Sequence, residues 1–255
     1  MAGHSHWANI ARKKALVDNK RGKLWSKLAK AIIVAAKLGG GDPDANLRLR
    51  YAIDAARAVS MPNENISRAI KTGTGELQTG NLEESIYEGY GPGGVAVMCE
   101  ILTDNRNRTA PEIRKIFEMN DGKLGASNCV AWMFERKGLF LVPAQHVTED
   151  RLVDIALEAG ADDVAAAGKA FEVTCDPSRF EQVAAAFKEA RIPTDLADVT
   201  RVATGKVELG LDDARRVVSL INALEEHEDV QSVTANYSIP DDILEAVLAG
   251  QDSGA

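Results

Sequence analysis

The sequence predicts an α+β protein: an N-terminal helical module followed by two α/β domains, one of which is ferredoxin-like and inserted into the other. Three observations predict this. The first 75 residues carry apolar side chains at helical spacing. Strand and helix patterns alternate after them. A complete β-α-β-β-α-β order can be followed between residues 138 and 204. A chain of 255 residues is long enough for two or three such units.

The N-terminal module, residues 1–75, is expected to contain three helices. The clearest runs from about Asp18 to Leu38 and ends at a run of three glycines. A second is expected from Ala45 to Val59. It should end before Pro62, because proline disfavours helix at the residue that precedes it. A third, short helix follows this break and completes the module.

The second unit is predicted to be discontinuous, formed by residues 76–137 plus 205–240. Its first part has two strands around a glycine-rich turn, a helix opened by the capping-box pattern Thr109-Ala-Pro-Glu112, and a further strand. A second helix and strand that would complete it appear only after residue 204. The expected elements are the strands Ile86–Tyr90, Val95–Thr103 and Val130–Phe134, the later helix Asp212–Glu226 and the later strand Ser232–Tyr237.

The ferredoxin-like domain is expected at residues 138–204. Asp176 followed by Pro177 is a good start signal for its second helix, since an N-cap residue precedes a proline at the first helical position. Residues 241–255 are expected to form a C-terminal helix and tail. The inserted elements are the strands Leu139–Val142, Asp163–Ala167, Ala170–Cys175 and Asp198–Val202 and the helices Glu149–Ala159 and Pro177–Ala190.

Charge is divided unevenly along the chain. The net charge of −8 by itself argues against a polyanionic partner. Residues 1–75, however, carry 14 Lys and Arg against 5 Asp and Glu, whereas residues 76–255 carry 16 against 33. Binding responds to the local field rather than to the mean charge. The sequence therefore predicts a polyanionic partner for the N-terminal end alone, and we expect the acidic remainder to fold back and screen it.

Basic residues dominate the first 40 positions, in which Asp18 is the only acid. Five lysines of the first long helix fall within an arc of about 100° beside its apolar face. Such a face suits a phosphate backbone, which gives affinity without specifying sequence. The alternatives are a solvated helix face and a membrane-surface helix; the near absence of acids favours nucleic acid. The predicted binding residues are Arg12, Lys13, Lys14, Lys20, Arg21, Lys23, Lys27 and Lys30.

Two polar segments of the second unit carry weaker signals. Gly89-Tyr-Gly-Pro-Gly-Gly94 matches neither phosphate-loop pattern and is predicted to be a hairpin turn. Asp104-Asn-Arg-Asn-Arg-Thr109 precedes a helix, so Arg106 and Arg108 are candidates for phosphate contacts near a helix N-terminus. The alternative is a polar loop in which Asp104 and Asn107 satisfy local backbone groups.

Several protein classes are disfavoured. The sequence has no apolar run of the ~20 residues needed to cross a bilayer and no apolar signal region at its start, so a cytoplasmic protein without a membrane partner is expected. Cys99, Cys129 and Cys175 form no CxxC pair, which disfavours disulfides and cysteine metal sites. No familiar catalytic motif is present, and we expect no enzyme, cofactor or small-molecule substrate.

Four segments together resemble the YebC/PmpR family. They are Met1-Ala-Gly-His-Ser-His-Trp-Ala-Asn-Ile10, Ala35-Ala-Lys-Leu-Gly-Gly-Gly-Asp-Pro-Asp-Ala-Asn46, Tyr87-Glu-Gly-Tyr-Gly-Pro-Gly-Gly94 and Asp104-Asn-Arg-Asn-Arg-Thr109. The resemblance covers nearly the whole chain, with one small departure, since residue 6 is more often Lys in the family. It implies three domains and a cytoplasmic DNA-binding transcriptional regulator. Members related to the mitochondrial translational activator of cytochrome c oxidase imply an alternative, a ribosome-associated factor that binds rRNA or tRNA and eases translation of proline-rich stretches.

Overall fold

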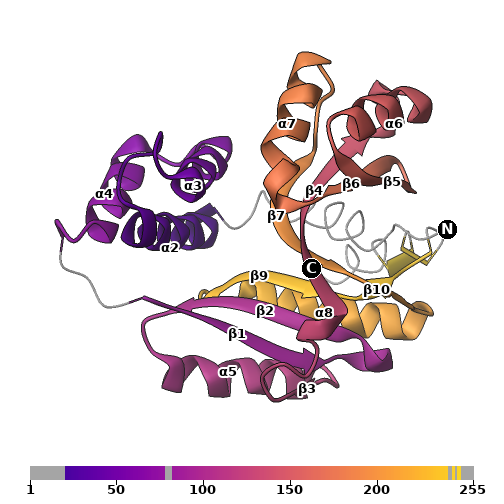
Figure 1. Ribbon diagram of the computed structural model, residues 1–255. Coiled ribbons are helices and arrows are strands. Elements are labelled where there is room, and N and C mark those ends of the chain that lie inside the picture. Colours follow the sequence, from indigo (N-terminus) through magenta and orange to yellow (C-terminus); the bar gives the residue numbers. More distant parts are fainter. Residues whose placement is uncertain (1–20, 78–81, 241–242, 245, 248–255) are drawn as a thin grey trace.

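A computed structural model describes residues 21–77, 82–240, 243–244 and 246–247 (Figure 1). A helical module is followed by two four-stranded antiparallel sheets, each with helices on one face. This arrangement confirms the predicted α+β fold class. Four of the predicted binding residues, Arg12, Lys13, Lys14 and Lys20, lie outside the described residues, as does most of the predicted C-terminal helix and tail.

The helical module consists of α2 (Arg21–Gly39), α3 (Leu47–Ala58) and α4 (Asn63–Gly73). Apolar side chains from all three helices form its core, with Ile32, Leu49 and Ile66 among the buried members. Asn46 joins α2 to α3. Its Oδ1 caps α3 by accepting from the Leu49 amide (3.1 Å), while its Nδ2 donates to the carbonyl oxygens of Ala35 and Gly40 (both 2.8 Å).

The first sheet joins strands from distant parts of the sequence. Its order is β3 (Lys123–Leu124), β1 (Glu83–Tyr90), β2 (Ala96–Thr103) and β9 (Val230–Ala235). The helices α5 (Arg106–Met119) and α8 (Leu211–Glu226) pack on one face through a core that includes Phe117 and Leu220. The helical module and the second sheet lie on the other side (Figure 1).

The second sheet has the order β5 (Ala161–Ala167), β6 (Ala170–Cys175), β4 (Phe134–Pro143) and β7 (Leu196–Ala203). The helices α6 (Glu149–Glu158) and α7 (Phe180–Glu189) cover one face of it. Phe140 of β4 stacks on Phe180 at a centroid distance of 4.7 Å and meets Phe187 edge-on at 5.2 Å. These aromatic contacts anchor α7 to the middle of the sheet.

Short elements complete the fold. The strand β8 (Val207–Glu208), which follows the second sheet in the chain, pairs in parallel with β10 (Tyr237–Ser238), which follows the first. A 3-10 turn at Pro92–Gly94 links β1 to β2, which confirms the hairpin predicted there. Gly93 and Gly94 both have positive φ (68° and 76°), a conformation that favours glycine. Further 3-10 turns lie at Ala131–Met133, Ala144–His146 and Pro177–Arg179.

Three element predictions were wrong. The strand expected at Val130–Phe134 does not form: Ala131–Met133 is a 3-10 turn, and Phe134 is the first residue of β4. The buried Glu88 carboxylate accepts the Val130 and Ala131 amides in place of a strand partner. Helix α5 begins at Arg106 rather than at the Thr109 capping box, because Asn105 is its N-cap. The last predicted strand is divided, since β9 ends at Ala235 and Tyr237 pairs in β10.

Candidate nucleic-acid interface

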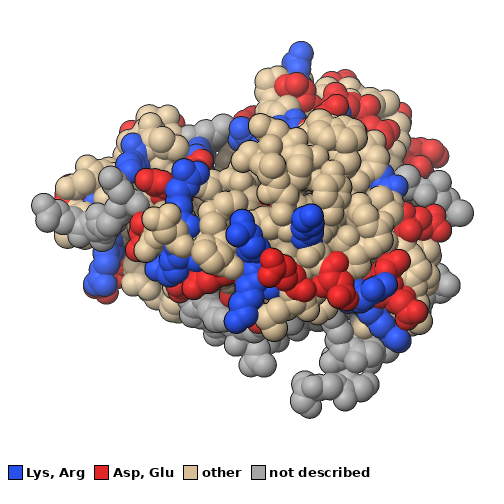
Figure 2. Space-filling view, turned by 90° about the horizontal axis from the view of Figure 1, so that it is seen from below, with Lys and Arg blue, Asp and Glu red and all other residues tan. Residues whose placement is uncertain are grey.

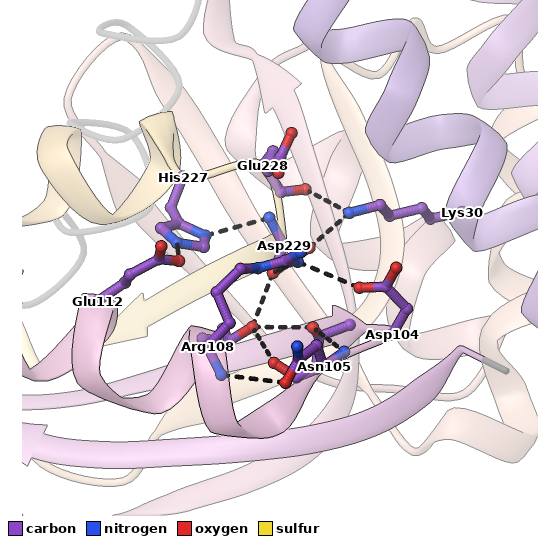
Figure 3. A network of polar contacts seen from close by, with 10 residues as sticks. Lys30, Asp104, Asn105, Arg108, Glu112, His227, Glu228 and Asp229 are labelled. Carbon is purple, nitrogen blue, oxygen red and sulfur yellow. Dashed lines mark hydrogen bonds and ion pairs between the residues drawn. The ribbon is translucent and has the colours of Figure 1, made fainter. Parts of the chain in front are cut away.

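Helix α2 is docked against the turn between α8 and β9. Lys27 Nζ donates to the carbonyl oxygen of Glu225 at the end of α8. Lys30 lies one turn further along α2, and its Nζ donates to the Glu228 carbonyl oxygen (3.1 Å) and to Asp229 Oδ1 (2.6 Å). Two lysines of the predicted phosphate-binding face therefore point at the acidic part of the same chain; Figure 3 shows the Lys30 contacts.

Asp229 is the centre of this contact. Its side chain is 1 % exposed and accepts from Lys30, from Arg108 Nη2 (3.0 Å) and from the Thr109 hydroxyl (2.8 Å). Burial by itself raises the pKa of the Asp229 carboxyl, but the hydrogen bonds from Lys30, Thr109 and Arg108 hold that pKa well below its usual range. The group is therefore a buried anion shared by two elements that are far apart in the sequence.

His227, which belongs to the same turn, connects it to α5. The Asp229 amide donates to His227 Nδ1 (3.2 Å), and His227 Nε2 lies 3.0 Å from Glu112 Oε2 on α5. Figure 3 shows this chain of contacts running from α5 through the turn to α2. Contacts from α5 and from α2 therefore meet at the same turn.

The first turn of α5 holds the two predicted arginines. Asn105 caps it by accepting from the Arg108 amide (3.2 Å), so Asn105, not Asp104 or Asn107, satisfies the local backbone. Arg108 also meets Asp104 Oδ1 (3.2 Å). The hydrogen bond to Asp229, and after it the charges of Asp229 and Asp104, raise the pKa of the Arg108 guanidinium. Arg106 Nε donates to Ser85 Oγ (2.7 Å). The side chains of Arg106 and Arg108 are 58 % and 41 % exposed, which leaves part of each guanidinium open to solvent.

Arg48 and Tyr51 of the module also contact the remainder of the chain. Arg48 Nη2 lies 2.5 Å from Glu84 Oε1 at the start of β1. The Tyr51 hydroxyl donates to Glu181 Oε1 on α7, and the Tyr51 ring meets Phe180 edge-on at 5.7 Å. In these polar contacts, as in that of Lys30, the module supplies the donor and the remainder supplies the acceptor. The observed docking therefore follows the division of charge seen in the sequence.

The structure brings together only some of the ten predicted binding residues. Lys30 and Arg108 converge on Asp229, and Lys27 binds the Glu225 carbonyl oxygen nearby. Arg106 points instead to Ser85 on β1. Arg21 and Lys23 belong to the first turns of α2, and their side chains lie outside what the structure describes. Other exposed cations of the module add to its basic character: Lys37, Arg48, Arg50, Arg57, Arg68 and Lys71.

The described basic side chains do not form one continuous patch on the face seen from below. Figure 2 shows that Lys and Arg are interspersed there with Asp and Glu.

Within the described part of the chain, no group of three or more His, Cys, Asp or Glu side chains is placed to hold a metal ion. Across the same residues, no helix combines the length and apolarity that spanning a membrane requires.

Sequence reasoning missed the acceptors of these contacts. Asp229 ends a run of charged residues after α8 and is typical of a solvated turn in sequence terms. Glu84 and Glu181 also look like ordinary surface carboxylates. Only the total charge of residues 76–255 pointed to these contacts. It predicts that acidic groups face the basic module, but it does not identify which ones.

Two family models match the chain. The one described as the TACO1/YebC protein N-terminal domain matches residues 5–76, and the one described as the TACO1/YebC second and third domain matches residues 82–237. A probable transcriptional regulatory protein of Rhodopirellula baltica is 54 % identical over 242 residues, which cover 94 % of this chain and 98 % of that protein. One of Pelotomaculum thermopropionicum is 55 % identical over 243 residues, covering 94 % and 100 %.

A solved structure has the same fold. The crystal structure of a conserved hypothetical protein from Aquifex aeolicus superposes with a TM-score of 0.80 at 47 % identity, covering 88 % of this chain and 93 % of that one. The names of the curated relatives describe transcriptional regulation. They give no support to the translational alternative that the resemblance also implied.

Proposed function

Because the chain belongs to the TACO1/YebC family, whose curated relatives are named probable transcriptional regulatory proteins, we propose that it is a non-enzymatic transcriptional regulator. It acts in the cytoplasm and binds DNA through its basic N-terminal module. The observation that carries this proposal is the excess of cations in residues 1–75 beside an acidic remainder. Lysine and arginine contacts to phosphates supply most of the affinity of such binding.

The docking contacts support the proposal chemically. Lys30 and Arg108 already bind a carboxylate, and a phosphate oxygen is an equivalent acceptor for both groups. DNA contact by Lys27 and Lys30 requires α2 to leave the α8–β9 turn. Arg106 and Arg108 would extend the contact across the first turn of α5. The remaining predicted cations of the module are Arg12, Lys13, Lys14, Lys20, Arg21 and Lys23.

Salt dependence of duplex binding tests the proposal. The test variant replaces Lys13, Lys14, Lys20 and Lys23 with Gln, which removes four module cations and leaves Lys27 and Lys30 in place. The slope of log affinity against log salt should flatten by about 0.9 for each phosphate contact that the substitutions remove. Affinity for a DNA duplex of mixed sequence should fall at low salt, as measured by fluorescence anisotropy.

A matched control removes the same charge elsewhere. Arg151, Lys169, Arg179 and Lys188 are exposed cations of the second-sheet domain, and their replacement with Gln changes the net charge equally. The proposal predicts a small effect on the slope for this variant. Equal slopes in the wild-type protein and the test variant would contradict DNA binding through the module, and equal reductions in both variants would show that net charge alone matters.

A further inference from the structure

The indole of Trp132 is exposed on the surface, at the end of the first sheet that lies farthest from Asp229. Trp132 is 72 % exposed, and Tyr90 at the end of β1 is 37 % exposed. Tryptophan is usually largely buried, because its ring contributes a large apolar area. An indole left this open in a folded domain therefore suggests a ligand that covers it.

The two rings are anchored on a single backbone group. Trp132 Nε1 donates to the Cys129 carbonyl oxygen (3.2 Å), and the Tyr90 hydroxyl donates to the same oxygen (3.1 Å). The polar edge of each ring is thereby occupied within the protein. What the rings offer outward is their apolar surface rather than a hydrogen-bonding group.

The segment that precedes Trp132 is held in place by the buried carboxylate of Glu88. Glu88 is buried, and its carboxylate accepts the backbone amides of Asn128 (2.8 Å), Val130 (2.9 Å) and Ala131 (2.8 Å). Three charge-assisted hydrogen bonds fix the chain up to the residue that precedes the indole. A ring on such a support loses little conformational freedom when a ligand stacks on it.

A cation lies beside the rings. Lys123 of β3 is directly opposite Tyr90 in the antiparallel register and is exposed. Side chains of directly opposed residues project from the same face of a sheet at about 5 Å. The surface therefore combines two fixed aromatic side chains with a lysine, which is the combination that holds a base and its adjoining phosphate.

We propose that Trp132, Tyr90 and Lys123 form a stacking site for an unpaired base of a nucleic-acid strand. The inference rests on the proposed function, because it presumes a nucleic-acid ligand, and it adds the kind of strand that this end of the sheet recognises. The indole face stacks on the base, and Lys123 contacts the flanking phosphate. Every base presents a π-face, so the site tolerates different sequences.

The position of the site separates it from the basic module. Ser85 and Tyr90 lie five residues apart on β1, which is about 17 Å along a strand. The Arg106 contact is at the Ser85 end, and Trp132 is at the Tyr90 end. The anchored rings are two side chains, and two side chains offer far less area than a protein interface buries. A single nucleotide fits it better than a protein partner does.

Binding of single- and double-stranded probes by the full-length chain tests the inference. The probes are a short single-stranded DNA of mixed sequence and the duplex of that sequence. Trp132→Ala should weaken binding of the single strand by about 5- to 140-fold, the range given by the loss of one base–aromatic stack. Trp132→Phe should restore most of the affinity, and duplex affinity should stay within about twofold in both variants.

The control is Leu157→Ala, which removes another exposed apolar side chain (52 % exposed) on α6, a helix of the second sheet. It should leave both affinities unchanged, and thermal melting shows whether each variant is folded. Equal single-strand affinity in wild type and Trp132→Ala overturns the stacking site while leaving the proposed function intact. Equal reductions for both probes also overturn it. Failure of the wild-type chain to bind either probe overturns the proposed function together with the stacking site.

Discussion

At the scale of single residues, Asp229 decides how the basic and acidic parts meet. Its carboxylate is buried and accepts from Lys30, Arg108 and Thr109. Removing one member of a buried charge pair is expensive, because the remaining charges lose their partner and stay partly desolvated. The side chains of Lys30 and Arg108 are 21 % and 41 % exposed, so water can compensate only in part.

Replacing Asp229 with Asn should lower the free energy of unfolding by about 3 kcal/mol at pH 7. The effect should depend on pH. The folded-state pKa of Asp229 is depressed, so its contribution is present above the unfolded pKa, about 3.9, and is lost as pH falls below it. Urea unfolding at pH 7, 5, 4 and 3 should therefore show wild type and variant converging in acid.

Asp104→Asn is the matched control for this prediction. Asp104 also meets Arg108, but its side chain is 55 % exposed, and an exposed pair contributes less than about 1 kcal/mol. Equal destabilisation by the two substitutions would contradict a special role for Asp229. So would a difference between wild type and Asp229→Asn that stays constant from pH 7 to pH 3.

The same residue shows where sequence reasoning ends. Helical spacing correctly placed Lys27 and Lys30 on one helix, but it carries no information on what lies opposite that helix. Glu88 is a similar case, because one acid within a strand pattern does not reveal that three amides of residues 128–131 will converge on it. Both Asp229 and Glu88 act through contacts between distant segments, which no local pattern encodes.

At the scale of elements, patterns with local causes were predicted well. The helices α3, α6 and α8 lie within two residues of their expected bounds, since apolar periodicity and breakers such as Pro62 act within a few residues. The start of α5 was wrong because two capping signals overlap. Asn105 and Thr109 can both cap a helix, and Thr109 is instead buried against Thr103 and Asp229. The tertiary contacts of Thr109 therefore determine that the helix is capped by Asn105 and not by Thr109.

The α2–α3 connection tests how much one capping residue contributes. Asn46 is buried, caps α3 through Oδ1 and donates from Nδ2 to two carbonyl oxygens at the end of α2. Asn46→Ala should lower the free energy of unfolding of the chain by about 2–3 kcal/mol, because it removes the α3 cap and both hydrogen bonds from Nδ2 to carbonyl oxygens at the end of α2. Urea unfolding followed by circular dichroism measures this.

Asp44→Ala, an exposed substitution two residues earlier in the same connection, is the control. Surface substitutions of this kind change stability by about 0.5 kcal/mol or less. If the two alanine variants unfold at the same urea concentration, the three hydrogen bonds of Asn46 do not hold the helices together. If only Asn46→Ala is destabilised, the module depends on this single side chain for its internal geometry.

At the scale of the whole molecule, the division of charge along the sequence becomes a contact between its parts. The module carries the donors Lys30, Arg48 and Tyr51, and the remainder carries the acceptors Asp229, Glu84 and Glu181. The structure places acidic side chains against the basic module, and screening of the module by the acidic part stays a prediction. If the module binds DNA as proposed, DNA phosphates compete with carboxylates of the same chain, so weaker docking should give tighter DNA binding.

A double variant, Glu84→Gln with Glu181→Gln, tests this competition without touching the module. It removes two acceptors of the docked module and leaves Asp229 and its network intact. We expect duplex affinity at low salt to rise by about 3- to 10-fold, the equivalent of weakening the docking by roughly 1 kcal/mol. Small-angle scattering should show a larger radius of gyration as the module spends more time undocked.

The matched control, Glu149→Gln with Glu158→Gln, neutralises two exposed carboxylates of α6 and makes the same change in net charge. If both double variants gain affinity equally, long-range repulsion between DNA and the acidic remainder explains the gain, and docking does not compete. If only the Glu84/Glu181 variant gains affinity and expands, the acidic part occupies the DNA-binding module directly. In that case the net charge of −8 is compatible with DNA binding because part of the negative charge is already neutralised within the chain.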